Sequence, residues 1–188
     1  MSYLFLIRHA KTQPDPQRQA KDWRLVEGAE LACQDLAKKL ATKGVSRIIS
    51  SKEHKAERTA EMIAKYLKLS SMSVEGLHEQ DRSQAPFLSE ELFQMNMKQG
   101  FENPNRLIWG VETMNQALDR FEHKVTQLLK QYPSEKLAIV SHGTVMSLFV
   151  AKFNYVDPYS LWRKLKMPDM LELSLPYFQL SASAQMFG

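Results

Sequence analysis

The sequence predicts an α/β protein, a three-layer α/β/α sandwich around a mostly parallel central sheet. Short apolar runs, each long enough for one strand, alternate with segments whose apolar residues recur every three or four positions. The runs are almost wholly apolar, as expected for strands that are covered on both faces. With 188 residues, 44% of them hydrophobic and 24% charged, the chain is expected to form one domain over residues 1–188.

Charge and cysteine content narrow the classes of partner. The net charge is +4, but the basic residues are scattered, with no block of like charge that would indicate a nucleic-acid-binding arm. Cys33 is the single cysteine, so we expect no internal disulfide and no thiolate metal cluster. No stretch approaches the ~20 apolar residues that cross a bilayer, and the N-terminal run lacks the features of a signal peptide. We therefore expect a cytoplasmic protein with neither nucleic acid nor membrane as partner; the oligomeric state stays open.

The first strand is predicted over Tyr3–Ile7, an apolar run that ends abruptly in Arg8 and His9. A polar loop, Gln13–Arg24, follows it and contains two prolines that prevent a helix from continuing out of the strand. Apolar residues then recur at helical spacing until Gly44 ends the helix: Leu31, Ala32, Leu36, Ala37 and Leu40.

The second strand is predicted over Ser46–Ser51, and its Ser-Ser end is suited to capping the next helix, Lys52–Leu67. Met72 and Val74 indicate a third strand. Residues 80–110 show little periodicity apart from a short helix that opens at Ser89, and we expect them to cap an active site. The large aromatic residues of this segment could line the site or form core: Phe87, Phe93, Phe101 and Trp109.

The second half of the chain continues the alternation of strands and helices. Its clearest helix is predicted over Glu112–Tyr132 and ends before Pro133. A fourth strand is predicted over Lys136–Ser141, and it leads through His142 and Gly143 into another helix. The remaining predicted elements are the helices Val145–Phe153 and Tyr159–Leu165 and a late strand, Leu171–Leu175.

Two of these buried strands end in a histidine, His9 and His142. Ligands of open α/β sheets gather at the carboxyl ends of the strands. If the two strands are neighbours in a parallel sheet, the two histidines lie ~5 Å apart, or about twice that if one strand intervenes. The His142-Gly143 step from strand to helix would also turn backbone N–H groups and a helix N-terminus toward an anion.

Charged residues are expected beside this histidine pair. Lys55 and Arg58 are three residues apart and share a face of the helix that begins near residue 52. Glu79 lies in a loop after the third predicted strand. Two histidines, several cations and one acid suit a phosphate ester whose leaving group needs a proton.

Taken in order, these residues resemble the signature of the histidine phosphatase superfamily, also called phosphoglycerate mutase-like. Arg8-His9-Ala10 is similar to the family's Arg-His-Gly motif, and Ser141-His142-Gly143 is similar to the segment of its second histidine. The other similar stretches lie between them in the family's order: Trp23–Gly28, Ser50–Glu61, Leu77–Glu79 and Gly110–Thr113. The resemblance runs the length of the chain and implies the same three-layer fold.

The resemblance also implies roles. His9 would be the nucleophile that carries a phosphohistidine, which requires a neutral imidazole whose other ring N–H is held by an acceptor. Arg8 and Lys55 would bind phosphoryl oxygens, with His142 and Gly143 at the second strand end adding donors. Glu79 would protonate the leaving alkoxide, for which it needs a raised pKa, and then activate water.

Two positions depart from the family's pattern. Lys55 stands where an arginine is usual; it keeps the charge but loses the forked geometry, and Arg58 one turn later could compensate. Ala10 stands where glycine is usual, which would cost roughly 1 kcal/mol if the backbone there has positive φ.

The expected function is therefore a metal-independent and cofactor-free phosphomonoesterase acting on a small phosphorylated molecule. Three alternatives remain: a phosphoglycerate-type mutase, a non-catalytic phosphate-binding protein, and a metallohydrolase in which the two histidines and a carboxylate hold zinc. Cations beside the histidines disfavour the last of these, because they repel a metal ion and attract a phosphate.

Overall fold

The computed structural model describes residues 2–181 and contains one six-stranded sheet in the order β3-β2-β4-β1-β5-β6. The strands are β1 (Tyr3–Arg8), β2 (Arg47–Ser51), β3 (Ser71–Val74), β4 (Leu137–Ser141), β5 (Asp169–Ser174) and β6 (Gln179–Leu180). The helices are the short 3-10 helix η1 (Ala20–Asp22), α1 (Ala29–Lys43), α2 (His54–Leu67), α3 (Glu90–Glu102), α4 (Met114–Gln131), α5 (Gly143–Phe153) and α6 (Pro158–Lys164).

The first four strands form a parallel half of the sheet, and the last two close it as an antiparallel edge. β1 and β4 are direct neighbours, with Arg8 opposite Ser141. The prediction of a mostly parallel sheet is confirmed, and the late strand is present as β5, antiparallel to β1. β6 was not predicted, because two residues are too few to produce a periodic pattern.

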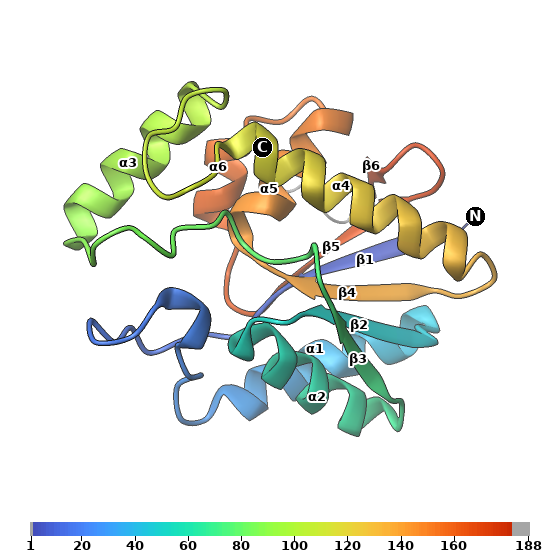
Figure 1. The fold of residues 1–188 in the computed structure, drawn as a ribbon. Coiled ribbons are helices and arrows are strands. Elements are labelled where there is room, and N and C mark those ends of the chain that lie inside the picture. The colour runs from blue at the N-terminus through green and yellow to red at the C-terminus, as the bar shows by residue number, and fades with distance from the viewer. Residues whose placement is uncertain (1, 182–188) are drawn as a thin grey trace.

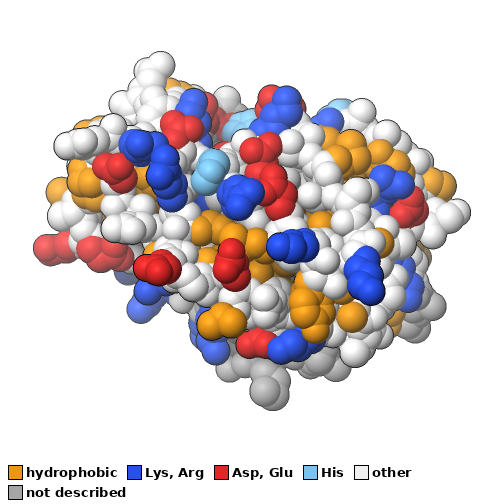
Figure 2. Space-filling model, turned by 90° about the horizontal axis from the view of Figure 1, so that it is seen from below, with side chains coloured by type: hydrophobic (Ala, Val, Ile, Leu, Met, Phe, Trp, Pro, Cys, Tyr) orange, Lys and Arg blue, Asp and Glu red, His pale blue; other side chains and the backbone are white. Residues whose placement is uncertain are grey.

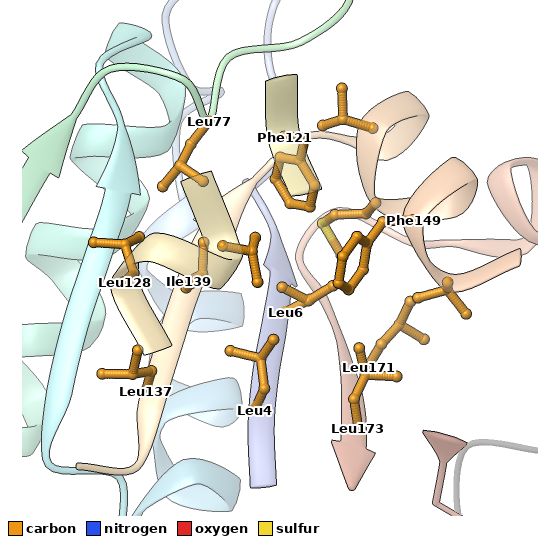
Figure 3. Packing of buried hydrophobic residues seen from close by; sticks show 14 of the residues in the cluster. Leu4, Leu6, Leu77, Phe121, Leu128, Leu137, Ile139, Phe149, Leu171 and Leu173 are labelled. Atoms are coloured by element: carbon orange, nitrogen blue, oxygen red, sulfur yellow. The ribbon is translucent and has the colours of Figure 1, made fainter. Parts of the chain in front are cut away.

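Helices cover both faces of the sheet, which makes the predicted three layers (Figure 1). α1 and α2 lie on one face, and α4 and α5 lie on the other. Figure 3 shows the second interface, where leucines of β1 and β5 meet Phe121 of α4 and Phe149 of α5. The two phenylalanine rings pack edge to face with centroids 5.6 Å apart.

Local sequence explains where several helices begin and end. Thr113 and Gln116 form a capping box at the start of α4, which fixes that end beside the loop that precedes it. α1 ends at Gly44, whose φ of 70° is the left-handed conformation that glycine adopts without strain. Cys33 is a buried member of the core under α1, as expected for a small apolar residue.

Two boundaries differ from the sequence prediction. Ser50 and Ser51 do not cap α2: they are buried at the end of β2, and the helix begins at His54 with Glu53 as its N-cap residue. The helix that opens at Ser89 is not short but continues to Glu102 as α3. Tertiary packing stabilises the additional turns of α3, because Met97 and Phe101 pack in a small cluster with Trp162 of α6.

The carboxyl ends of β1 and β4 lie at one edge of the sheet, and two irregular segments gather there (Figure 1). The loop after β1, which contains η1, approaches from the side of α2, and its η1 residue Ala20 accepts a hydrogen bond from Lys55. The segment after β3 meets the strand end through Ser141, whose hydroxyl donates to the Leu77 carbonyl at 2.7 Å. Within residues 2–181, no helix combines the length and the apolar character needed to cross a membrane.

Candidate active site

His9 follows the last residue of β1 and is 6% exposed. Its backbone N–H donates to the carbonyl of Ser141 at 3.0 Å, so the β1–β4 ladder continues to this residue. Its Nδ1 lies 2.7 Å from the Ala10 carbonyl. Because a carbonyl only accepts, Nδ1 carries the proton, and the neutral ring has its lone pair on Nε2. Burial, followed by the charges of His142 and Lys55, holds the pKa of His9 well below its usual range.

His142 is fully buried at the N-terminus of α5, with its ring centroid 5.2 Å from that of His9. The predicted proximity of the two strand-end histidines is confirmed. Neither ring nitrogen of His142 has a hydrogen-bond partner among the described residues, although Nε2 is 3.5 Å from a carboxylate oxygen of Glu53. Burial is the main cause that holds its pKa well below the usual range, with Lys55 next. The site therefore presents two neutral imidazoles.

Arg8 lies beside the histidine pair and packs against the first turn of α5. One of its terminal nitrogens donates to the Leu165 carbonyl at 2.6 Å, whereas its buried Nε has no partner among residues 2–181. The guanidinium approaches Gly143 so closely that a Cβ there would lie 3.0 Å from its Cζ and Nε. Glycine at position 143 is thus explained by the close approach of Arg8.

Lys55 reaches the site from the first turn of α2 and is 5% exposed. Its ammonium donates to the Ala20 carbonyl at 2.8 Å and pairs with Glu53. Thr59, one turn further along α2, accepts a hydrogen bond from the Ala10 N–H at 2.9 Å, which fixes α2 against the end of β1. Ala10 is not among the described residues with positive φ, so the strain that glycine would relieve does not arise.

Glu79 occupies the N-terminus of α5. Its two carboxylate oxygens accept the backbone N–H groups of Thr144, at 3.0 Å, and Val145, at 3.3 Å. Burial alone would raise the pKa of Glu79, but Arg82, His142 and the backbone N–H groups of Thr144 and Gln80 lower it below its usual range. The raised pKa that a general acid needs is therefore absent in this state of the site.

The segment that carries Glu79 is held by one arginine of α4. Arg120 donates to the carbonyls of Gly76, His78 and Glu79 at 3.1, 2.9 and 3.1 Å. It also pairs with Glu112 at 2.5 Å, and the same carboxylate oxygen accepts the Asp81 N–H at 2.8 Å. The main chain beside Glu79 is thus fixed by a partly buried network rather than by regular secondary structure.

Two further charged residues belong to the site and were not predicted to be part of it. Glu53 accepts the Glu79 N–H at 2.8 Å and pairs with Lys55; burial would raise its pKa, but Lys55 lowers it. Arg82 donates to the Thr144 hydroxyl at 3.1 Å, lies 3.6 Å from Glu79 and sits over the Trp109 ring. The Nε of Arg82 is buried and, among residues 2–181, has no partner. In the sequence, the only signal for them was their charge: Glu53 lies in a stretch similar to the family's motif, and Arg82 lies in the loop after Glu79. Charge alone does not show whether a side chain points into the site.

The family model of the histidine phosphatase superfamily (branch 1) matches residues 4–177. The chain belongs to this superfamily. The predicted resemblance is confirmed, and members of this superfamily are phosphatases or mutases.

Curated relatives named as a phosphatase and as a mutase both match this chain. It is 24% identical over 161 residues to the uncharacterized phosphatase PhoE of Bacillus subtilis, covering 84% of this chain and 80% of the relative. It is 26% identical over 168 residues to the probable phosphoglycerate mutase GpmB of Cronobacter sakazakii, covering 85% and 78%.

Solved structures share the fold at lower sequence identity. A phosphoserine phosphatase mutant of Entamoeba histolytica in complex with phosphoserine matches with a TM-score of 0.78 and 17% identity, over 100% of this chain and 99% of that one. A mycobacterial glucosyl-3-phosphoglycerate phosphatase matches with a TM-score of 0.73 and 16% identity, over 91% and 89%.

The structure brings most of the predicted site residues of this superfamily member together and leaves one apart. Arg58 is half exposed on the outer face of α2 and pairs with Glu61, so it does not reach the histidine pair. Within residues 2–181, no three His, Cys, Asp or Glu side chains are arranged to hold a metal ion. The residues that do meet at the strand ends are Arg8, His9, Lys55, Glu79, His142 and Gly143, with Glu53 and Arg82 beside them.

Proposed function

We propose that this chain is a metal-independent phosphomonoesterase that hydrolyses a small-molecule phosphate ester through a phosphohistidine on His9. The observation that carries the proposal is the hydrogen bond from His9 Nδ1 to the Ala10 carbonyl, in a ring held neutral by its surroundings. A neutral imidazole with its lone pair on Nε2 is the form that can attack phosphorus.

In the first step, His9 Nε2 attacks the phosphorus in line, a P–N bond forms, and the P–O bond to the leaving alkoxide breaks. The charge on the phosphoryl oxygens must be held throughout this transfer. Arg8 and His142 are suited to this task because each has buried nitrogen atoms without a partner among the described residues. Lys55 adds a cation from α2, and Gly143 allows Arg8 to lie against α5.

Arg82 extends this set of phosphate ligands from a different element. Its guanidinium supplies a fork of donors that Lys55 cannot, and its Nε is buried without a described partner. It lies near Glu79, at the same end of α5 that Arg8 approaches. We therefore assign to Arg82 the compensation for Lys55 that the sequence had suggested for Arg58.

The leaving alkoxide takes its proton from Glu79, which then accepts a proton from the water that hydrolyses the phosphohistidine. Glu79 is ionised in the resting protein, because Arg82, His142 and backbone N–H groups outweigh its burial. A phosphate group bound to the same cations opposes their effect and raises the carboxyl pKa. A phosphate monoester has a second pKa of about 6, so a substrate that binds as the monoanion can transfer its proton to the Glu79 carboxylate, which then passes it to the leaving alkoxide.

The proposal is tested by incubating the purified protein and His9→Ala with 4-nitrophenyl phosphate, with and without a chelator. We expect turnover that survives the chelator and is lost in the variant, with one inorganic phosphate released per nitrophenol. Turnover that the chelator abolishes would contradict the metal-independent route. Phosphate-dependent stabilisation without turnover in either Lys55→Arg or the parent chain would favour a binding protein.

A mutase is distinguished by its products. A phosphoglycerate-type mutase converts a phosphorylated carboxylic acid into its isomer and releases little free phosphate. We expect free phosphate to be the main product with every substrate that turns over. Isomer formation from 3-phosphoglycerate in excess of phosphate release would overturn the phosphatase assignment.

A further inference from the structure

Glu53 places a nearly buried carboxylate beside a site that is proposed to bind an anion. Its side chain is 11% exposed. Figure 2, which views the molecule from the side of α1 and α2, shows Asp and Glu side chains interspersed with Lys and Arg side chains over that face. Glu61 of α2 is an exposed carboxylate of this kind and pairs with Arg58. Glu53 differs, because a carboxylate beside the histidine pair repels a phosphate, so its place in the site calls for an explanation.

The side chain of Glu53 does not serve its own helix. Glu53 is the N-cap residue of α2, a position where a polar side chain often accepts a hydrogen bond from the first turn, but it makes no such bond. One carboxylate oxygen instead accepts the Glu79 N–H at 2.8 Å and lies 3.5 Å from His142 Nε2. The other oxygen accepts a hydrogen bond from the Lys55 ammonium. The carboxylate therefore connects the start of α2 to the site.

Lys55 is held from two sides. Its ammonium has three N–H groups, of which one donates to Glu53 and another to the Ala20 carbonyl at 2.8 Å. Within residues 2–181 the ammonium makes no further hydrogen bond. Because the three N–H groups have a tetrahedral arrangement, the two bonds fix the direction of the third. That third N–H is left for a phosphoryl oxygen.

This arrangement offsets a weakness of lysine as a phosphate ligand. An arginine presents a planar fork whose donors have a fixed geometry, whereas the lysine ammonium ends a flexible chain and has rotatable donors. Donors stabilise a transition state most when they are already in place as its charge develops. Glu53 restricts the Lys55 ammonium to one position, although its own charge repels the phosphate.

We infer that Glu53 is a positioning residue: it sets the direction of the Lys55 ammonium, and thereby lets lysine bind the phosphoryl group at a position where arginine is usual. The inference rests on the proposed function, in which Lys55 binds the reacting phosphate. In that proposal Arg82 supplies the forked donor, and Glu53 supplies the fixed position of the second cation. It follows that the chain needs Glu53 only while residue 55 is a lysine.

A double-mutant cycle tests this dependence. Glu53→Gln, whose amide oxygen can still accept the Glu79 N–H, should lower kcat for 4-nitrophenyl phosphate about 10-fold because Lys55 loses its direction. In the Lys55→Arg background the same substitution should lower kcat less than about 3-fold, because the guanidinium keeps its own fork. Glu61→Gln, which also removes one carboxylate from α2, should have no effect in either background. A role limited to holding the main chain of Glu79 would give equal losses in both backgrounds, and that result would overturn the inference.

The position of the Lys55 ammonium is measured separately from catalysis, by NMR of protein labelled with ¹⁵N-lysine. An ammonium that is buried and bound on two sides exchanges its protons slowly with water, so Lys55 should give a resolved side-chain signal, assigned by its loss in Lys55→Arg. The signal should disappear in Glu53→Gln and remain in Glu61→Gln. Its persistence in Glu53→Gln, or its absence from the parent chain, would overturn the inference. If the parent chain shows no turnover, the proposed function fails and this spectrum alone decides the inference.

Discussion

The site is built from two regions that hold their residues in different ways. At the strand ends, the β1–β4 register and the hydrogen bond from His9 N–H to Ser141 fix both histidines through regular backbone. Around them, the loop wall (residues 13–24 and 76–82) contains no strand, and side chains from other elements tie it to the site, among them Arg120 on one part and Lys55 on the other.

We infer from this difference that the strand ends hold the reacting groups, whereas the loop wall determines which substrates bind. The strand ends belong to the hydrophobic core, so their geometry depends on many contacts and tolerates little change. Apart from Leu77, which is buried in the core, the loop wall is held mainly by polar contacts. A family built this way can change its substrate by altering the wall while the reacting histidine stays in place.

The largest loss of activity is expected from substitution of Glu79, which lies where the two regions meet. Glu79→Gln should lower kcat for an alkyl phosphate about 10²- to 10³-fold, because the alkoxide then lacks its proton donor. The loss should be much smaller for 4-nitrophenyl phosphate, whose leaving group needs no proton. Steady-state kinetics on both substrates checks this.

Glu53→Gln is the matched control, since Glu53 holds Lys55 and the Glu79 N–H. It should affect the two substrates alike. If Glu79→Gln also affected them alike, Glu79 would be only an anchor for the N-terminus of α5, and the proton would come from elsewhere.

Stability should show the same contrast between regions. Leu6 is fully buried in the core below the site, so Leu6→Ala should lower the free energy of unfolding by about 3 kcal/mol. Phe87, which is 52% exposed and contacts the edge of Trp23, lies beyond the loop wall, and Phe87→Ala should cost less than about 1 kcal/mol. Urea denaturation measures both; equal losses would show that these loops are part of the folding core.

A smaller loss of activity is expected for Arg82, which belongs to the loop wall but is proposed to bind the reacting phosphate. Arg82→Gln should lower kcat/KM for 4-nitrophenyl phosphate about 10- to 100-fold, as expected for loss of a charged hydrogen bond. Lys55→Arg in the Arg82→Gln background should restore part of this loss by returning a forked donor to the site. A merely structural Arg82 would not be rescued this way, and Arg106→Gln, elsewhere in residues 80–110, should have no effect.

The smallest effect concerns the pH dependence of stability. The pKa of His142 is held well below its usual range, chiefly by burial, so the unfolded chain binds a proton near pH 6.5 that the folded chain does not. The free energy of unfolding should therefore fall by about 1 kcal/mol on this account between pH 7 and pH 5.5. His142→Gln should make the profile shallower over that range in denaturant titrations; an unchanged slope would mean that His142 is protonated in the folded protein.

The contrast also explains what the sequence could predict. The apolar runs that end in His9 and His142 predicted the strands, and a parallel sheet then required both histidines at one edge. The helix predicted from residue 52 placed Lys55 beside them, but it placed Arg58 on the same face, and Arg58 is instead exposed and paired with Glu61. All of this follows from periodicity, which the core imposes along the chain.

The remaining features depend on residues distant in the sequence. The lowered pKa of Glu79 comes partly from the Thr144 N–H of α5, 65 residues away. Arg82 and Glu53 take their directions from hydrogen bonds that no local pattern encodes. The same holds for α3, whose continuation past Leu92 depends on packing against Trp162. Local sequence contains no signal for such contacts, so loops and pKa directions required the structure.

The central claim is a covalent phosphate on His9, and trapping it is the most direct test. The protein is mixed with excess 4-nitrophenyl phosphate, quenched with alkali within its first turnovers, and digested for mass spectrometry, with His9→Ala as control. We predict one added phosphoryl group on the peptide that contains His9, and none on the same peptide of the variant. Turnover without any phosphorylated peptide, or a phosphoryl group on another residue that persists in His9→Ala, would contradict the account.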